Sequence, residues 1–145
     1  MNHIVFMNRC IELALMAKKR GDHPVGSVVV QGERVIGEGI EGGRTFNDIS
    51  RHAEMEAIRE ATQLLKSQDL SGTVLYTTHE PCIMCSYMIR HTRIEMVVTG
   101  IKVPETGGFS SAYPLLLDKT IKKWGDPPGL VFGVLEKECR ELTAV

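Results

Sequence analysis

Strand-like and helix-like segments alternate along this chain, and the alternation limits the possible folds more than any other feature of the sequence. Short β-branched and apolar runs indicate strands, at residues 25–30, 34–40, 73–77, 95–99 and 130–135. Amphipathic or capped segments indicate helices, at residues 2–20, 52–66, 81–92, 115–123 and 136–142. Such alternation predicts an α/β fold in which helices cover a sheet and crossovers join parallel strands.

The first two strands are an exception to the parallel arrangement. Residues 31–33 form a short turn between them, which predicts an antiparallel hairpin and therefore a mixed sheet. With 145 residues, of which 43% are apolar, the chain is long enough for one domain, residues 1–145, with a sizeable core. The first helix is expected to bury a stripe of apolar residues, namely Ile4, Met7, Ile11, Ala14 and Leu15.

Two cysteines open the predicted helix at residues 81–92, in the motif Pro81-Cys82-Ile83-Met84-Cys85. Their three-residue spacing places both sulfurs on one face of a first helical turn, where unpaired N–H groups and the helix dipole favour the thiolate form. Two thiolates and one imidazole make a good zinc set, and three protein ligands leave a fourth position for water. The sequence therefore predicts a catalytic zinc site.

The imidazole comes from His52 in the motif His52-Ala53-Glu54, which opens the preceding helix. Residues two apart in a regular helix point about 200° away from each other, so both side chains face one site only if His52 lies at the N-cap or in the first turn. Glu54 shares an inward stripe with Ile58, Ala61 and Leu65. A carboxylate in a water-poor pocket is poised to exchange a proton, so we expect Glu54 to carry a proton from the zinc water to the substrate.

Neither motif is specific when it occurs alone. A His-x-Glu sequence is common by chance, and a Cys-x-x-Cys sequence also occurs as a redox pair or as half of a structural metal site. The combination is more specific, because both motifs open helices and the interval between them holds one helix and one strand. Two alternatives stay open: a redox dithiol, and a zinc-stabilised module without activity. Cys10 and Cys139 are expected to be buried free thiols outside the site.

The charge balance argues against a strongly basic protein. The chain has 17 Lys and Arg against 18 Asp and Glu, a formal net charge of −1, whereas a protein that grips nucleic acid through phosphates usually has a basic excess. The apolar run at residues 4–7 is too short for a secretion signal or a membrane span. We therefore expect a reducing, cytoplasmic location without membrane association.

The two motifs resemble those of the cytidine deaminase-like superfamily, and within it the branch of guanine deaminases, tRNA adenosine deaminases and fungal-type cytosine deaminase. The similarity runs from about residue 10 to residue 108 and includes Pro24-Val25-Gly26-Ser27-Val28, Val35-Ile36-Gly37-Glu38-Gly39, Leu75-Tyr76-Thr77-Thr78, Arg93-Ile94 and Val97-Val98-Thr99-Gly100. It implies a three-layer α-β-α sandwich with a mixed five-stranded sheet, one zinc ion per chain, a homodimer, and hydrolytic release of an exocyclic amino group as ammonia.

The resemblance also implies roles for individual residues. It makes His52, Cys82 and Cys85 the zinc ligands and Glu54 the proton shuttle, and it places the backbone N–H groups of Ala53 and Cys82 against the substrate. The predicted substrate-contacting residues are Pro24, Glu41, Ala53, His79, Cys82 and Phe109.

Three of these contacts need separate comment. Glu41 stands where the branch usually carries an Asn that contacts the base. An ionised carboxylate accepts hydrogen bonds but does not donate them, so Glu41 is expected to suit a ring that presents N–H or amino donors. His79 either borders the pocket or lies at the surface. Phe109 either stacks on a flat ring or fills the core.

The expected activity is deamination of a small purine or pyrimidine base or nucleoside, with a guanine deaminase-like enzyme as the preferred prediction. The alternative is a tRNA-specific adenosine deaminase, which needs a basic surface for phosphates and a pocket for a flipped base. The last predicted helix, at residues 136–142, argues against this alternative because it carries three acids against two bases. A small molecule is therefore the expected partner, with tRNA less favoured.

Overall fold

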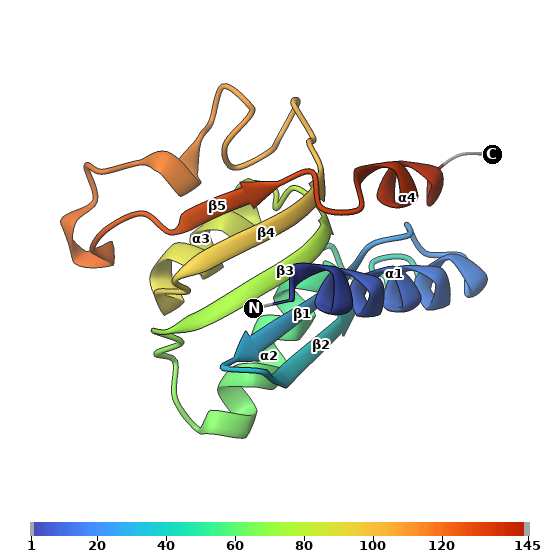
Figure 1. Cartoon of the computed structure of the whole chain (residues 1–145), viewed down its shortest axis with the longest axis horizontal. Coiled ribbons are helices and arrows are strands. Elements are labelled where there is room, and N and C mark those ends of the chain that lie inside the picture. Colours follow the sequence, from blue (N-terminus) through green and yellow to red (C-terminus); the bar gives the residue numbers. More distant parts are fainter. Residues whose placement is uncertain (1, 144–145) are drawn as a thin grey trace.

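The computed structural model describes residues 2–143 and contains a five-stranded sheet with strand order β2-β1-β3-β4-β5 (Figure 1). The strands are β1 (Gly26–Gln31), β2 (Arg34–Ile40), β3 (Thr73–His79), β4 (Met96–Ile101) and β5 (Gly129–Phe132). Strand β1 is antiparallel to both β2 and β3, while β3, β4 and β5 are parallel. The predicted mixed sheet and the opening hairpin are confirmed.

Helices cover both faces of this sheet (Figure 1). They are α1 (His3–Lys19), α2 (Ala53–Leu65), α3 (Ile83–Thr92) and α4 (Glu136–Glu141). Alternate residues of β1 divide the core: Val29 packs with Ile58 of α2 and Ile89 of α3, whereas Val28 packs with Met7 of α1 and Cys139 of α4. The α/β fold is therefore a three-layer arrangement, as expected. None of the helices within residues 2–143 is long and apolar enough to cross a bilayer.

The face that α1 buries differs from the expected stripe. Ile4 and Leu15 are 55% and 51% exposed, and the helix instead buries Phe6, Met7, Cys10, Leu13, Ala14 and Ala17. The expected stripe is confirmed at Met7 and Ala14 and is wrong at Ile4 and Leu15, because apolar residues lie around most of this helix and close packing chooses the face. At Gly26 of β1, a Cβ atom would lie 2.0 Å from the carbonyl oxygen of Cys10. Only a face of small residues allows α1 to come so near the sheet.

The helix expected at residues 115–123 is also wrong. The chain there forms two 3₁₀ turns, Leu115–Leu117 and Lys122–Trp124. The guanidinium of Arg90 donates hydrogen bonds to the carbonyl oxygens of Leu115 and Asp118, at 2.8 and 2.7 Å. The carbonyl oxygen of Leu115 also accepts from the N–H of Asp118 at 3.4 Å, which is the spacing of a 3₁₀ turn and not of an α-helix. The Asp118 carboxylate also accepts from the backbone N–H of Thr120 at 2.6 Å, which favours a turn.

Candidate functional site

The strand register brings four segments of the chain to one edge of the sheet. Gly26 at the start of β1 is paired with Ile40 at the end of β2, and Ser27 of β1 with Thr77 near the end of β3. His79, at the end of β3, is paired with Ile101 at the end of β4. Residues that precede β1 and residues that follow β2, β3 and β4 therefore meet at this edge. The starts of α2 and α3 lie at the same place.

Each predicted metal-ligand motif begins a helix. His52 is the N-cap of α2 and Cys82 is the N-cap of α3, both with extended backbone angles. The N-cap position expected for His52 is thus confirmed, and it resolves the conflict between the His-x-Glu spacing and helix geometry. Glu54 then lies inside α2 and is only 4% exposed. Both side chains border the same cavity.

The three candidate ligands have the separations that a tetrahedral zinc ion requires. Zn–S bonds of about 2.3 Å and Zn–N bonds of about 2.0 Å place two sulfur ligands about 3.8 Å apart, and a sulfur and a nitrogen about 3.5 Å apart. The Sγ atoms of Cys82 and Cys85 are 3.7 Å apart. The Nδ1 atom of His52 lies 3.5 Å from each of them. The donor set and its geometry therefore both fit zinc.

The same three side chains perturb one another's protonation. Contacts with Cys85 and, to a smaller extent, with His52 lower the pKa of the Cys82 thiol to about 4, although burial raises it. Contact with Cys82 raises the pKa of His52 to about 9, and contact with Cys82 also raises the pKa of Cys85. These contacts favour the thiolate form of Cys82, which is the form that binds a metal, and metal binding to such a set is coupled to the release of protons.

The cavity beside these ligands is small and contains several ionisable groups. Its volume is about 240 Å³, slightly below the range of about 300–1,000 Å³ for sites that take drug-sized ligands, so it suits a single small ring system. Burial raises the pKa of Glu54 to about 8. A carboxyl group with this pKa exchanges a proton readily at neutral pH. The lining residues are His23, Val25, Glu41, His52, Glu54, His79, Glu80, Cys82, Val103 and Thr106.

The predicted substrate contacts fall into two groups. Glu41, His79 and Cys82 line the cavity. Pro24, Ala53 and Phe109 are outside the set of lining residues. Ala53 is completely buried at the start of α2. The ring of Phe109 packs against the core cluster on the α2 and α3 side, with the ring of Phe132 6.4 Å away, which matches the core-filling alternative.

Sequence reasoning missed five of the residues that line the cavity. They are His23, Val25, Glu80, Val103 and Thr106. Three of them had a detectable signal, because His23 and Val25 flank Pro24 and Glu80 precedes Pro81. Val103 and Thr106 lie in a loop without such a signal, and only the pairing of β3 with β4 brings this loop to the site.

His79 presents an unused nitrogen in this region. The residue is 7% exposed, and burial, with a smaller effect of His23, lowers the pKa of its imidazole to about 4, so the ring is neutral at pH 7. Its Nδ1 atom lies 2.8 Å from Oγ1 of Thr78. The Thr78 oxygen also accepts from the N–H of Gly26 at 3.3 Å. The other ring nitrogen of His79, Nε2, is buried and has no hydrogen-bond partner among residues 2–143.

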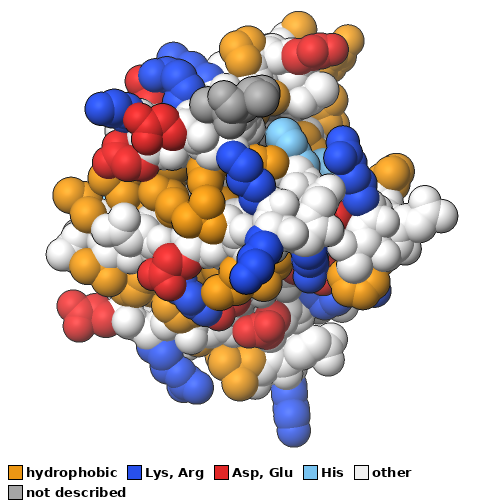
Figure 2. Space-filling model, turned by 90° about the vertical axis from the view of Figure 1, so that its right-hand side faces the viewer, with side chains coloured by type: hydrophobic (Ala, Val, Ile, Leu, Met, Phe, Trp, Pro, Cys, Tyr) orange, Lys and Arg blue, Asp and Glu red, His pale blue; other side chains and the backbone are white. Residues whose placement is uncertain are grey.

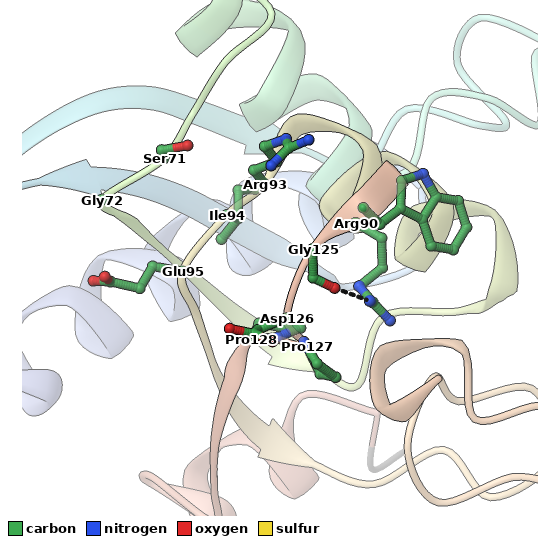
Figure 3. Close-up of a pocket in the computed structure, with 11 residues that line it drawn as sticks. Ser71, Gly72, Arg90, Arg93, Ile94, Glu95, Gly125, Asp126, Pro127 and Pro128 are labelled. Atoms are coloured by element: carbon green, nitrogen blue, oxygen red, sulfur yellow. Dashed lines mark hydrogen bonds between the residues drawn. The ribbon is translucent and has the colours of Figure 1, made fainter. Parts of the chain in front are cut away.

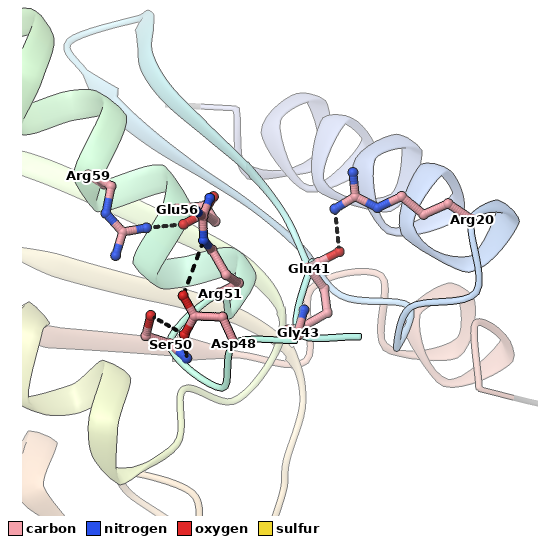
Figure 4. A network of polar contacts seen from close by, with 8 residues as sticks. All are labelled: Arg20, Glu41, Gly43, Asp48, Ser50, Arg51, Glu56 and Arg59. Atoms are coloured by element: carbon pink, nitrogen blue, oxygen red, sulfur yellow. Dashed lines mark hydrogen bonds and ion pairs between the residues drawn. The ribbon is translucent and has the colours of Figure 1, made fainter. Parts of the chain in front are cut away.

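Glu41 is fixed by hydrogen bonds on both sides (Figure 4). Its carbonyl oxygen accepts from Nη2 of Arg20 at 2.8 Å, and its Oε2 atom accepts from the N–H of Gly43 at 3.0 Å. Figure 4 also shows the following turn, in which Asp48 contacts Arg51 and Arg51 reaches Glu56 of α2. The backbone of Glu41 is therefore held by Arg20 at the end of α1, and its carboxylate is held by its own loop.

Asp22 connects the end of α1 to the same loop. Its carboxylate accepts from the backbone N–H groups of Arg44 and Thr45, each at 2.9 Å, and pairs with Arg20 at 2.7 Å. Burial opposes ionisation, but the hydrogen bonds from Thr45, Arg20 and Arg44 outweigh it and lower the pKa of Asp22 to about 2. This carboxylate stabilises the folded state only while it is ionised.

We expect the substitution Asp22→Asn to lower the free energy of unfolding by about 1–3 kcal/mol at pH 7, because an amide supports fewer of these hydrogen bonds. The wild-type advantage is fully present above the unfolded pKa of 3.8 and is lost as the pH falls toward the folded pKa of about 2. Urea unfolding at pH 7, 5 and 3.5 measures this dependence. Asp126→Asn, at an exposed aspartate, is the control. An equal effect of both substitutions at all three pH values contradicts the prediction.

A second hollow, of about 370 Å³, lies at the opposite edge of the sheet (Figure 3). Its two arginines already have partners. Arg90 donates to the carbonyl oxygens of Leu115, Asp118 and Gly125, and Arg93 donates to that of Lys123 at 2.7 Å. These arginines hold the loop between β4 and β5, so this hollow is structural and the cavity beside His52 is the candidate active site.

Comparison with known proteins agrees with this geometry. The family model described as "Cytidine and deoxycytidylate deaminase zinc-binding region" matches residues 1–101. The tRNA-specific adenosine deaminase of Aquifex aeolicus is 35% identical over 122 residues, which cover 82% of this chain and 81% of that protein. The corresponding protein of Buchnera aphidicola is 35% identical over 138 residues, covering 94% of this chain and 83% of that protein.

Two solved structures are also similar. A structure from a study of A-to-I editing by tRNA:A34 deaminases has a TM-score of 0.87 and 32% identity, with 94% of this chain and 97% of that chain covered. Guanine deaminase from Bacillus subtilis has a TM-score of 0.68 and 37% identity, with 70% of this chain and 66% of that chain covered. The likeness to the tRNA deaminase thus extends over nearly all of both chains.

Proposed function

Because this chain belongs to the cytidine and deoxycytidylate deaminase zinc-binding family, we propose that it acts on an adenine carried by a tRNA. The protein is a zinc-dependent deaminase that hydrolyses a C–N bond. The observation that supports tRNA as the substrate is the extent of the similarity: tRNA adenosine deaminases match 94% of this chain at 35% identity and in structure at a TM-score of 0.87. This proposal replaces the small-molecule substrate favoured by the sequence alone.

The residues at the cavity supply the parts of a hydrolytic deamination. His52, Cys82 and Cys85 would hold a zinc ion, which when bound would supply an activated water. Glu54, buried beside the ligands, takes a proton from the attacking water and delivers it to the exocyclic amino group. The water oxygen bonds to the ring carbon, the C–N bond breaks, and the amino group leaves as ammonia. Burial of Glu54 favours its protonated form and a bound cation would favour its ionised form, so the carboxyl group is suited both to take the proton and to release it.

His79 is placed to orient the base. Its Nε2 atom has no protein partner among the described residues, which leaves it available for a hydrogen bond with the edge of the substrate ring. A buried polar atom that stays unpaired costs free energy, and a bound base that pairs with it recovers this cost.

A free base is the second candidate substrate, and Glu41 is the observation that favours it. The carboxylate lies at the cavity wall and accepts hydrogen bonds without donating them. A free base has a ring N–H at the position where a nucleoside carries its sugar, and this donor suits Glu41. On the face shown in Figure 2, basic and acidic side chains are interspersed, whereas RNA binding usually uses a gathered basic surface.

Ammonia release and inosine formation distinguish the two candidates. Zinc-loaded protein is incubated with a tRNA anticodon stem-loop that carries adenosine at the wobble position, and separately with adenosine, adenine, guanine and cytosine. The proposal expects inosine in the stem-loop, with a rate that falls as salt rises. Turnover of free bases alone would replace tRNA with the second candidate, while the reaction type would stand.

Substitution of Glu41 by Asn tests the contact with a substrate donor. If Glu41 accepts from a ring N–H, we expect Glu41→Asn to lower kcat/KM on free bases about tenfold or more relative to nucleosides, because the substituted amide loses the ionic acceptor. If Glu41 instead accepts from a ribose hydroxyl, we expect kcat/KM to fall for the nucleoside or the stem-loop. The measurement is kcat/KM over the whole panel. An unchanged ranking of substrates would show that Glu41 does not select among them.

A further inference from the structure

The loop that follows β4 is fastened to one buried carboxylate, that of Glu80. Its Oε1 atom accepts from the backbone N–H of Val103 at 2.8 Å and from the hydroxyl of Ser110. Its Oε2 atom accepts from the backbone N–H groups of Phe109 and Ser110, each at 2.8 Å. Glu80 is 3% exposed. Four donors thus converge on this carboxylate, which satisfies a buried charge without a cation.

The backbone of the same loop lies directly on the segment that carries the first cysteine ligand. Gly107 forms an antiparallel bridge with Cys82, and the N–H of Gly108 donates to the carbonyl oxygen of Pro81 at 2.8 Å. A Cβ atom at Gly107 would lie 2.1 Å from the carboxyl carbon of Glu80. The loop therefore closes over the carboxylate as tightly as a glycine allows.

The cavity depends on this attachment. Val103 and Thr106, which belong to the loop, line the cavity. Glu80 and Cys82, which precede α3 or begin it, also line the cavity. Other lining residues, including Glu41 and Glu54, come from other segments of the chain. Without its attachment to Glu80, the loop would keep the contacts of Gly107 with Cys82 and of Gly108 with Pro81. The N–H groups of Val103, Phe109 and Ser110 would lose their acceptor, and the wall next to Val103 would lose its position.

We propose that Glu80 is a positioning residue for substrate binding: its carboxylate holds the loop of residues 103–110 in place, so that Val103 and Thr106 complete the wall of the cavity. The inference rests on the proposed function only in assuming that a base binds in this cavity. The role belongs to the carboxylate in particular, because its two oxygens together accept four hydrogen bonds and a neutral amide has only one accepting oxygen.

Glu80→Gln is the main test. We expect KM to rise about tenfold or more for the substrate that the wild type turns over, because about two of the four donors lose their acceptor. We expect kcat to change less than about threefold and zinc to stay at one ion per chain, because Glu54 and the metal ligands are unchanged. The matched control is Glu105→Gln, which removes the same charge from an exposed residue of the same loop and should leave KM unchanged.

Two further variants separate this role from general damage to the fold. Gly107→Ala should also raise KM in the wild-type background, because the new methyl group meets the Glu80 carboxylate. In a Glu80→Ala background, Gly107→Ala should raise KM much less, because the carboxylate that the new methyl group would meet is gone. Ser110→Ala removes one of the four contacts and should have a smaller effect than Glu80→Gln.

Hydrogen exchange provides a measurement that needs no substrate. The amides of Val103, Phe109 and Ser110 should be protected in the wild type and exchange faster in Glu80→Gln, while the amides of β4 keep their protection. Equal KM and equal exchange for Glu80→Gln and Glu105→Gln would overturn the inference, as would a loss of zinc in Glu80→Gln that accounts for its whole defect. Wild-type protein without any deaminase activity would instead refute the proposed function, and the exchange data would still decide whether Glu80 holds the loop.

Discussion

Replacement of Glu54 by Gln should reduce ammonia release by about 10³-fold or more while leaving zinc bound. General acid–base catalysis by one positioned group contributes typically about 10²–10⁴-fold. Glu54 has no substitute at the cavity for this role, because Glu41 and Glu80 have other hydrogen bonds to maintain. Gln has the same shape and does not exchange the proton. The measurements are single-turnover ammonia release and zinc content.

The adjacent acid on the same helix is the matched control. Glu56 pairs with Arg51 and Arg59 on the outer side of α2 and does not line the cavity. Glu56→Gln should therefore retain nearly full activity, with at most a small loss of stability. Equal rates in wild type and Glu54→Gln would contradict the proposed mechanism. Such a result, with zinc still bound, would favour the zinc-stabilised module without activity.

Removal of one metal ligand should have the second large effect. We expect Cys85→Ser to weaken zinc binding by at least about 100-fold, because loss of a ligand exceeds the 10–100-fold effect of losing a residue that orients one. Activity should fall to background at the zinc concentrations that saturate the wild type. Zinc at 100 times its Kd stabilises a protein by about 2.7 kcal/mol, so added zinc should raise the thermal stability of the wild type. The variant binds zinc much more weakly, so its thermal stability should no longer respond at the same zinc concentration.

The other thiols provide the control for this substitution. Cys139 is completely buried in the core cluster on the α1 and α4 side, outside the cavity. Cys139→Ser should lower stability but keep one zinc ion per chain. Treatment of the wild type with a chelator should abolish activity, and added zinc should restore it. A protein that lacks zinc, stays folded and reduces a disulfide substrate would instead support the redox dithiol.

Local spacing was enough to predict the central part of the site. The conflict between the His-x-Glu spacing and helix geometry required His52 to precede the regular helix, and the structure has it at the N-cap. The stripe that includes Ile58 predicted an inward Glu54, and that residue is 4% exposed. The three-residue spacing of the cysteines likewise predicted neighbouring sulfurs. These features depend on a few consecutive residues, for which helix geometry determines direction.

Other features depend on contacts that local patterns do not contain. The buried face of α1 is chosen by its close approach to Gly26, and the segment at residues 115–123 gives up a helix because Arg90 binds its carbonyl oxygens. In each case the partner contacts the segment in space but lies outside it in the sequence. Helical periodicity therefore predicted a helix in both places but missed the face of the first and the interruption of the second.

The sequence by itself determined the α/β class, the zinc ligands expected at two helix starts and the proton-carrying glutamate, because each follows from short-range spacing. The tertiary structure decided the cavity. His23, Val103 and Thr106 reach it only because β1 is antiparallel to β3 while β3 is parallel to β4, which brings the start of one strand and the ends of two others to a single edge. Glu80 then joins two of these segments through four hydrogen bonds. Pairing between distant segments sets these positions, and spacing along the chain does not encode them.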